Sequence, residues 1–126
     1  MILADTNVWI EHLRGTRRAC ALEDLLNREQ VLFHPWVHGE LVLGNLGPKK
    51  REIGLYFSLL PTTVAHPLHD LIQFVERESL SGKGLSLIDA QLLYGSVKDD
   101  HLLWTFDKAL RKAAERFDRA YENNSP

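Results

Sequence analysis

The sequence predicts an α/β protein in which helices cover both faces of a central, mostly parallel sheet, a three-layer α/β/α sandwich. The first observation is a set of short apolar runs of strand length, such as residues 1–4 and 101–105. The second is that segments with apolar residues at helical spacing lie between these runs, so that strand and helix alternate throughout the chain. Such alternation implies parallel strands joined by right-handed crossovers, with helices packed on both faces.

The elements of the first half are bounded by clear start and stop signals. The opening apolar run ends abruptly at Asp5, Gly15 stops the helix that follows, and Pro35 suits the first turn of a later helix. The expected elements, in order, are a strand over 1–4, helices over 7–14 and 17–28, a strand over 31–33, a helix from 35 that ends before Gly47-Pro48, and a helix over 49–60.

The second half continues the alternation. Ser86 and Asp89, three residues apart, form the pattern of a capping box and predict a helix start. The expected elements are a β-branched run of strand type over 62–65, a helix over 68–80, a loop over 81–84, the helix opening at Ser86, a strand over 101–105 and a last helix from Asp107.

The length and composition indicate one ordinary globular domain over residues 1–126, with a frayed tail over 122–126. The chain is 44% hydrophobic and 25% charged, and no apolar run approaches the roughly 18 residues of a membrane span. It shows no leader of the secretory type. A single cysteine, Cys20, cannot form an internal disulfide, which is typical of a reducing compartment. We therefore expect a cytoplasmic protein with no membrane partner.

The net charge of −2 argues against a generic basic nucleic-acid binder. Local basic clusters are still consistent with a polyanionic substrate. The net charge is an average over one acidic cluster and several basic clusters. Each cluster is by itself typical of a solvated face. The clusters are Arg14 with Arg17 and Arg18; Lys49 with Lys50 and Arg51; and Lys108 with Arg111, Lys112, Arg116 and Arg119.

Four acidic residues stand where a predicted strand ends or among the apolar residues of a predicted helix: Asp5, Glu40, Asp89 and Asp107. Each of the three aspartates alone could serve as a helix cap or a first-turn acid, whereas Glu40 has no capping role. In a parallel sheet, ligands collect at the carboxyl ends of the strands, and the aspartates can all reach that edge. Converging carboxylates repel one another, so a cation between them is expected, and oxygen ligands favour Mg²⁺ or Mn²⁺.

Rival sites have weaker support. His34 and His38 are four residues apart and could share a helix face, but no HExxH pattern or cysteine cluster accompanies them, and a helix-capping role explains His34 equally well. No G-x-S-x-G elbow or Walker loop occurs in the sequence.

Four segments, in order, resemble those of the PIN-domain ribonucleases. They are Asp5-Thr6-Asn7 after the first strand, Glu40 in an early helix, 84–90 (GLSLIDA) at a late helix start, and Thr105-Phe106-Asp107 after the last strand. The match spans nearly the whole chain, and the small size is similar to that of the VapC toxins of type II toxin–antitoxin systems. The resemblance implies an endoribonuclease that uses Mg²⁺ or Mn²⁺ and an acidic quartet: Asp5, Glu40, Asp89 and Asp107.

The resemblance also implies supporting roles for Asn7, after the first acid, and Thr105, beside the last. Its implied partners are an RNA substrate, a cognate VapB-like antitoxin and a second copy in a homodimer. Within the quartet, we expect Asp5 and Asp89 to be central ligands and the other two acids to act from an outer shell. Basic side chains must hold the RNA backbone beside the acids, and the candidates are Arg14, Arg17, Arg18 and Lys83.

Three alternatives remain open from the sequence. One is a PIN nuclease that is not a toxin. Another is an aspartate-based phosphatase or receiver-like domain, although no second aspartate follows Asp5 at the required distance. The third is a non-catalytic module that binds RNA or a protein.

Overall fold

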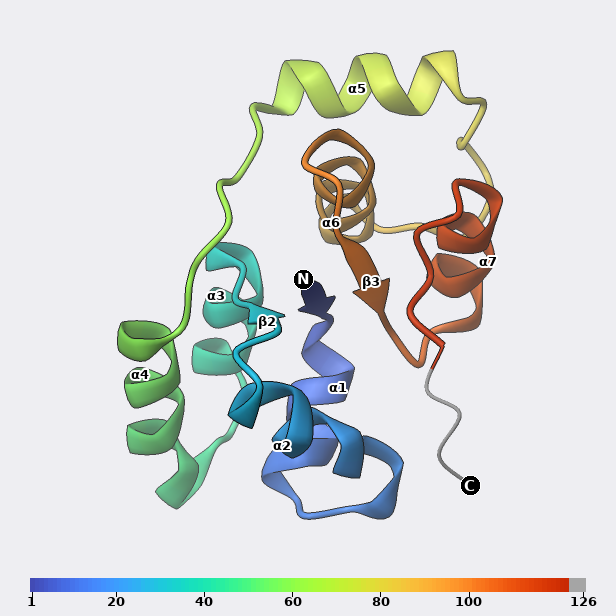
Figure 1. Cartoon of the computed structure of the whole chain (residues 1–126). Coiled ribbons are helices and arrows are strands. Elements are labelled where there is room, and N and C mark those ends of the chain that lie inside the picture. Colours follow the sequence, from blue (N-terminus) through green and yellow to red (C-terminus); the bar gives the residue numbers. More distant parts are fainter. Residues whose placement is uncertain (123–126) are drawn as a thin grey trace.

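A computed structural model describes residues 1–122 of the chain, and in it three strands form one parallel sheet (Figure 1). The strands are β1 (Ile2–Ala4), β2 (Val31–Leu32) and β3 (Leu102–Trp104), in the spatial order β2-β1-β3. Ile2 of β1 lies opposite Val31 on one side and Leu102 on the other. The predicted parallel sheet is confirmed, and each strand begins or ends within one residue of its expected position.

The helices lie within a few residues of their expected positions, but four α-helices follow one another between β2 and β3, so strand and helix do not alternate throughout. Figure 1 shows α1 to α4 grouped on the side of β2 and α5 to α7 on the side of β3. The α-helices are α1 (Thr6–Leu13), α2 (Cys20–Asn27), α3 (Pro35–Leu43), α4 (Lys50–Leu59), α5 (Leu68–Arg77), α6 (Leu87–Lys98) and α7 (Lys108–Arg116). Short 3-10 helices, η1 (Arg17–Ala19) and η2 (Gly47–Lys49), precede α2 and α4. The α/β sandwich is therefore the observed fold.

The β-branched run over residues 62–65 does not form a strand, and that prediction is wrong. Only one bridge joins it to the sheet, between Thr62 and Phe33. The cause is packing, because the side chain of Val64 is 63% exposed and the run has no apolar face to bury. The next residue, His66, is bound to α6 and not to the sheet. The side chain of Gln91 accepts from the backbone N–H of His66 at 2.7 Å and donates to its carbonyl at 3.0 Å.

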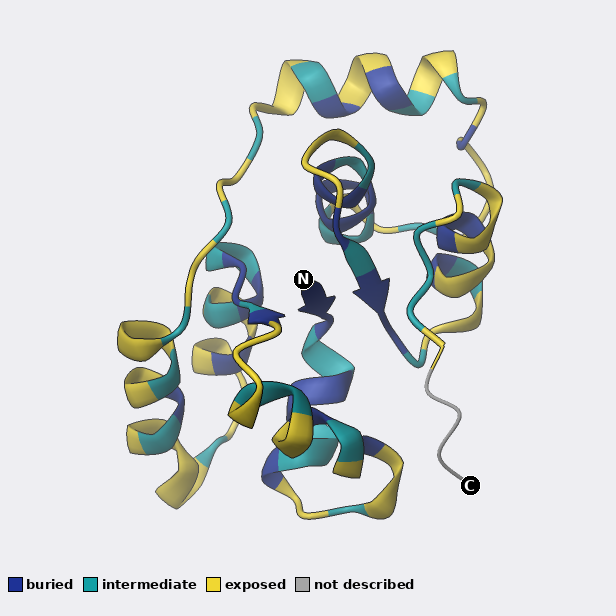
Figure 2. Ribbon diagram, viewed as in Figure 1, coloured by how far each residue is buried: buried dark blue, intermediate teal, exposed yellow. Residues whose placement is uncertain are grey.

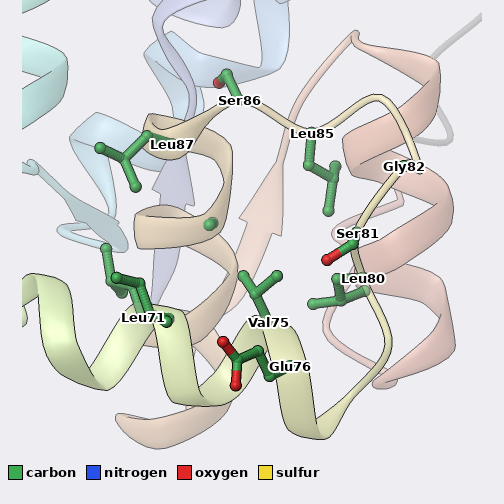
Figure 3. A pocket seen from close by; sticks show the side chains of 11 residues that line it. Leu71, Val75, Glu76, Leu80, Ser81, Gly82, Leu85, Ser86 and Leu87 are labelled. Carbon is green, nitrogen blue, oxygen red and sulfur yellow. The ribbon is translucent and has the colours of Figure 1, made fainter.

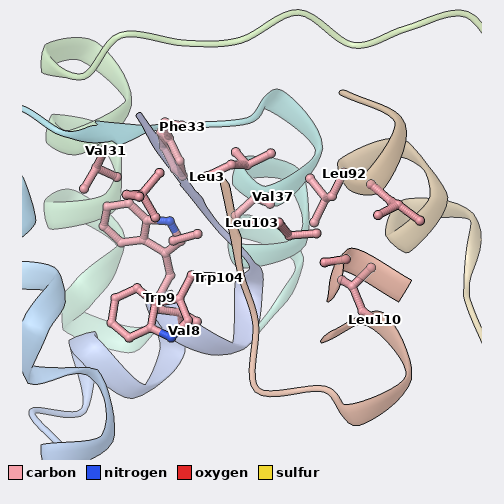
Figure 4. Packing of buried hydrophobic residues seen from close by; sticks show 14 of the residues in the cluster. Leu3, Val8, Trp9, Val31, Phe33, Val37, Leu92, Leu103, Trp104 and Leu110 are labelled. Carbon is pink, nitrogen blue, oxygen red and sulfur yellow. The ribbon is translucent and has the colours of Figure 1, made fainter. Parts of the chain in front are cut away.

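The core surrounds β1, whose three residues are all buried (Figure 2). A strand covered on both faces needs a continuous apolar run, which explains why the alternating polar pattern of a surface strand is missing. On one side Trp9 of α1 packs against Phe33 and Tyr56, with ring centroids 5.1 and 5.0 Å apart. On the other side the buried residues of α6 and α7 close the cluster (Figure 4).

The carboxyl edge of the sheet carries polar residues directly after the strands. Asp5 follows β1, and its backbone N–H still pairs with the carbonyl of Trp104 at 2.8 Å. Thr105 and Asp107 follow β3. After β2, His34 follows Phe33 and is the N-cap of α3. Polar groups from distant parts of the chain thus meet at one edge, as the topology requires.

No helix within residues 1–122 is long and apolar enough to cross a membrane. The frayed tail expected over 122–126 lies almost wholly outside the described residues. Glu122 is described, and its carboxylate pairs with Arg111 at 2.9 Å.

Candidate active site

Asp5 is the centre of the site, because its carboxylate is buried and receives several hydrogen bonds. Its side chain is 5% exposed. Oδ1 accepts from the backbone N–H of Thr6 at 2.7 Å. Oδ2 accepts from the hydroxyl of Thr105 at 2.7 Å and from the amide of Asn7 at 3.3 Å. These donors fix the rotamer of Asp5, which is also the N-cap of α1.

Burial is the main cause that raises the pKa of Asp5, from an ordinary 3.8 to about 6. The hydrogen bonds from Thr105 and Thr6 lower that pKa, and the negative charges of Asp89 and Glu40 raise it further. Within residues 1–122, none of these three acids takes part in an ion pair with Lys, Arg or His. The ionised form of Asp5 is therefore costly unless a cation approaches it.

Asn7 and Thr105 link the end of β3 to the start of α1. Besides its bond to Asp5, the Asn7 amide donates to the hydroxyl of Thr105 at 3.2 Å and accepts from the backbone N–H of Phe106 at 3.1 Å. The Thr105 hydroxyl accepts in addition from the backbone N–H of Asp107 at 3.1 Å. This network holds the segment after β3 against Asp5.

Glu40 lies on α3 and is exposed to solvent. Residues before and after it in the sequence are apolar, but Val42 and Leu43 are themselves exposed. The hydroxyl of Thr6 donates a short hydrogen bond to Oε1 of Glu40 and so orients it toward Asp5. Thr6 is a site residue that the sequence analysis missed. Its adjacency to Asp5 was the available signal.

Asp89 does form the predicted capping box at the start of α6 (Figure 3 shows Ser86 at this point). Its carboxylate accepts from the backbone N–H of Ser86 at 2.9 Å, and its own N–H donates to the Ser86 hydroxyl at 3.2 Å. The same carboxylate is near enough to Asp5 to raise its pKa. Capping and membership of the acidic group are therefore compatible, because the cap fixes the side chain that faces Asp5.

Asp107 stands apart from the other three acids. It is exposed and is the N-cap of α7, with Oδ2 accepting from the backbone N–H of Leu110 at 2.8 Å. Its charge is not among those that raise the pKa of Asp5. The structure thus brings together Asp5, Glu40 and Asp89, and it leaves Asp107 at the rim.

The donors of this group fit a hard divalent ion in their chemistry, since all are carboxylate oxygens and their charge is unbalanced. As the side chains stand, no set of three or more Asp, Glu, His or Cys residues within 1–122 is close enough to enclose an ion directly. Contacts through water would therefore have to complete the shell of an ion bound here.

The basic candidates lie around the acids rather than among them. Arg14 lines a cavity of about 300 Å³ together with Glu40 and Lys49, and it pairs with Glu11 at 3.7 Å. Lys83 lines a wider hollow of about 820 Å³ beside α7 with two further basic residues, Lys112 and Arg116. Arg17 and Arg18 are exposed on η1, and the guanidinium of Arg18 lies 4.1 Å from the ring centroid of Phe106.

A third cavity, of about 320 Å³, lies between α5 and the loop that leads into α6 (Figure 3). Its wall is mainly apolar, with Leu71, Val75, Leu80 and Leu85 pointing into it. It is separate from the acidic group, since none of the four acids lines it.

The rival histidine site is not formed. Nδ1 of His34 accepts from the backbone N–H of Trp36 at 2.9 Å, so His34 caps α3. Burial lowers the pKa of His34 from 6.5 to about 4, with smaller effects of His66 and His101. His38 instead stacks on Phe57, with ring centroids 4.2 Å apart. The two imidazoles have separate structural roles.

An acidic group at the carboxyl edge of a small parallel α/β sheet is the arrangement of a PIN domain, which is the class that the fold and the site define. Two solved structures share the fold. PAE2754 from Pyrobaculum aerophilum is 14% identical with a TM-score of 0.63, over 93% of this chain and 94% of that one. FitAcB from Neisseria gonorrhoeae is 23% identical with a TM-score of 0.64, over 91% and 94%.

Sequence comparison gives the family. No family model matches the chain. Ribonuclease VapC32 from two strains of Mycobacterium tuberculosis, CDC 1551 / Oshkosh and H37Rv, is 42% identical over 118 residues, which are 90% of this chain and 90% of the relative. The chain therefore belongs to the VapC family of PIN-domain ribonucleases, and the resemblance predicted from four short segments is confirmed.

Proposed function

We propose that the protein is a metal-dependent endoribonuclease that acts as a toxin and is neutralised by a cognate VapB-like antitoxin. The observation that carries the proposal is Asp5. It is a buried carboxylate at the carboxyl edge, next to Asp89 and Glu40, whose pKa is raised by burial and by their charge. Family membership at 42% identity to ribonuclease VapC32 supports RNA as the substrate.

Asp5 and Asp89 would hold Mg²⁺ or Mn²⁺, and Glu40 and Asp107 would hold water around it. A bound ion of this kind supplies Lewis-acid activation of water and offsets negative charge on the phosphoryl oxygens. The protein's own contribution is orientation. Thr105 and the backbone of Thr6 fix Asp5, the Thr6 hydroxyl fixes Glu40, and the capping box fixes Asp89. Carboxylates held in one rotamer are pre-organised for binding.

The basic residues that flank the acids would hold the RNA backbone. Arg14 and Lys49 share a cavity with Glu40 on one flank, and Lys83 lies with Lys112 on the other. Both flanks are needed, because the acidic group repels a polyanion.

Protein partners are part of the proposal, both the antitoxin and a second copy of the chain in a homodimer. The outer surface of α3 and α4 supports a protein contact, since large apolar side chains are exposed there: Val42, Leu43, Leu55 and Leu59, at 48%, 90%, 58% and 71%. We place the protein in the cytoplasm, and its lone Cys20, a free thiol, suits a reducing compartment.

Cleavage of a labelled single-stranded RNA by the purified protein tests the catalytic part. We expect cleavage with Mn²⁺ or Mg²⁺, none with EDTA, and none with Asp5→Asn. Asp24→Asn is the matched control, because Asp24 is an exposed acid on α2 that pairs with Arg28 at 3.1 Å. Full activity of Asp5→Asn, or activity that survives EDTA, would refute the metal site.

Two further measurements address the alternatives. A calorimetric titration that detects no Mn²⁺ binding would favour the non-catalytic module. Expression of the wild-type protein alone should arrest growth, and co-expression with the small reading frame beside it in the operon should relieve the arrest. Free growth together with intact nuclease activity in vitro would leave a PIN nuclease that is not a toxin.

A further inference from the structure

Arg18 and Phe106 form a stacked pair at the rim of the acidic site. The guanidinium carbon of Arg18 lies 4.1 Å from the centroid of the Phe106 ring. Phe106 stands between Thr105, which binds Asp5, and Asp107. The pair therefore combines a planar cation with an aromatic ring one residue away from two of the site residues.

Both members of the pair are held in place by the surrounding structure. The backbone N–H of Phe106 donates to Oδ1 of Asn7 at 3.1 Å, and Trp104 meets its ring edge-on at 5.9 Å. Arg18 lies on η1, which is anchored by the fully buried side chain of Ala19. A fixed platform loses little conformational entropy when a ligand binds to it.

The charge of Arg18 is not neutralised by a neighbour. Within residues 1–122 it forms no ion pair, whereas Arg111 pairs with Glu115 and Arg119 with Asp100. The residue is exposed, so its side chain is accessible to solvent.

We propose that Arg18, stacked on Phe106, is a subsite that stacks one unpaired nucleobase of a single-stranded RNA next to the bond that is cut. This inference rests on the proposed nuclease function and adds a base-binding subsite to it. A guanidinium plane stacks on bases and attracts phosphate, and it is less strongly hydrated than an ammonium group. Bases in duplex RNA are already stacked, so the subsite selects single-stranded segments.

The test measures binding and cleavage separately. Affinity for a fluorescent single-stranded RNA is measured by anisotropy in EDTA, and kcat and KM are measured with Mn²⁺. A set of RNAs carries one abasic nucleotide at each position in turn. The variants are Arg18→Gln, Arg18→Lys and Phe106→Leu. Arg17→Gln is the matched control, because Arg17 is an exposed arginine on the same turn. Melting curves confirm that each variant is folded.

Arg18→Gln is expected to raise Kd and KM about tenfold and to leave kcat unchanged, which is the size of one base-stacking contact. One abasic position should weaken wild-type binding about tenfold and affect Arg18→Gln and Phe106→Leu by less than about twofold. Arg18→Lys keeps the charge but loses the plane, so it should also lose this position dependence. Arg17→Gln should keep it.

A flat abasic scan, or the same loss of position dependence in Arg17→Gln and Arg18→Gln, would overturn the subsite and leave a simple charge effect. Cleavage without position dependence would refute the subsite but not the nuclease function. Position-dependent binding without metal-dependent cleavage would refute the nuclease function but not the subsite. If the wild-type protein binds no single-stranded RNA, both proposals fail.

Discussion

Replacing Asp5 with asparagine is expected to stabilise the metal-free protein above pH 6 and to destabilise it below pH 4. The reason is the buried charge. In the folded protein the pKa of Asp5 is raised by burial to about 6, above its ordinary 3.8. Between these pH values the folded state binds more protons than the unfolded state, so the stability contributed by Asp5 falls as pH rises through the window.

The magnitude follows from the same two values. A rise from 3.8 to about 6, at about 1.36 kcal/mol for each pH unit, makes the ionised form cost about 3 kcal/mol. Asparagine removes that cost. In the variant, however, its Nδ2 faces the Asn7 amide, which in the wild type donates a hydrogen bond to Asp5. The lost hydrogen bond costs about 1 kcal/mol. The net gain at pH 8 is about 2 kcal/mol, roughly 8 °C in Tm for a domain of this size.

The assay is thermal denaturation in EDTA from pH 4 to pH 8, monitored by circular dichroism. The comparison must be made between the variant and the wild type at each pH, because His34 acts in the opposite direction over the same range. Asp24→Asn serves as the control, because it removes an exposed carboxylate far from the buried one in sequence. Adding Mn²⁺ should raise the Tm of the wild type and not of Asp5→Asn. A variant that is less stable by the same amount at every pH would refute the reasoning.

Two further changes test other contacts of the site. Thr6→Val removes the hydroxyl that holds Glu40, so kcat should fall about tenfold with KM little changed, and Thr6→Ser should restore it; an unchanged kcat would contradict the role. His34→Asn keeps a helix cap but removes an imidazole whose pKa is about 4 when folded and 6.5 when unfolded. Because the unfolded state takes up that proton, the wild type loses up to about 3 kcal/mol as pH falls through this window. In urea unfolding, the free energy of unfolding should fall less steeply with decreasing pH for the variant than for the wild type. An equal slope in the two proteins would disprove the assignment.

The fold was predictable because its strands depend on a local signal. Residues 1–4 and 101–105 are apolar runs that pair with each other, so hydrophobicity alone marks them. The run over 62–65 has strand propensity without a buried face, and propensity alone did not decide its structure. The sequence of the run does not determine whether it has a buried face, because that depends on what packs against Val64.

The site was predictable only in part for a similar reason. Asp5 and Asp107 follow strands, so topology places them at one edge. Whether carboxylates face each other depends on rotamers and helix direction, which the order of strands and helices does not fix. The bond from Thr6 to Glu40 spans 34 residues and has no periodic signal.

Asp5 also shows how stability and function oppose each other at this site. A carboxylate after β1 could have been left at the surface, where its charge costs nothing, but there it would bind an ion weakly because water screens it. Burial raises the cost of the charge, and the donors from Thr6 and Thr105 recover only part of it. The unrecovered part is free energy that a proton or a divalent ion can release. The two therefore compete for the same oxygens, and the contribution of Asp5 to the stability of the metal-free protein is lowest at the pH at which the site is most ready to bind an ion.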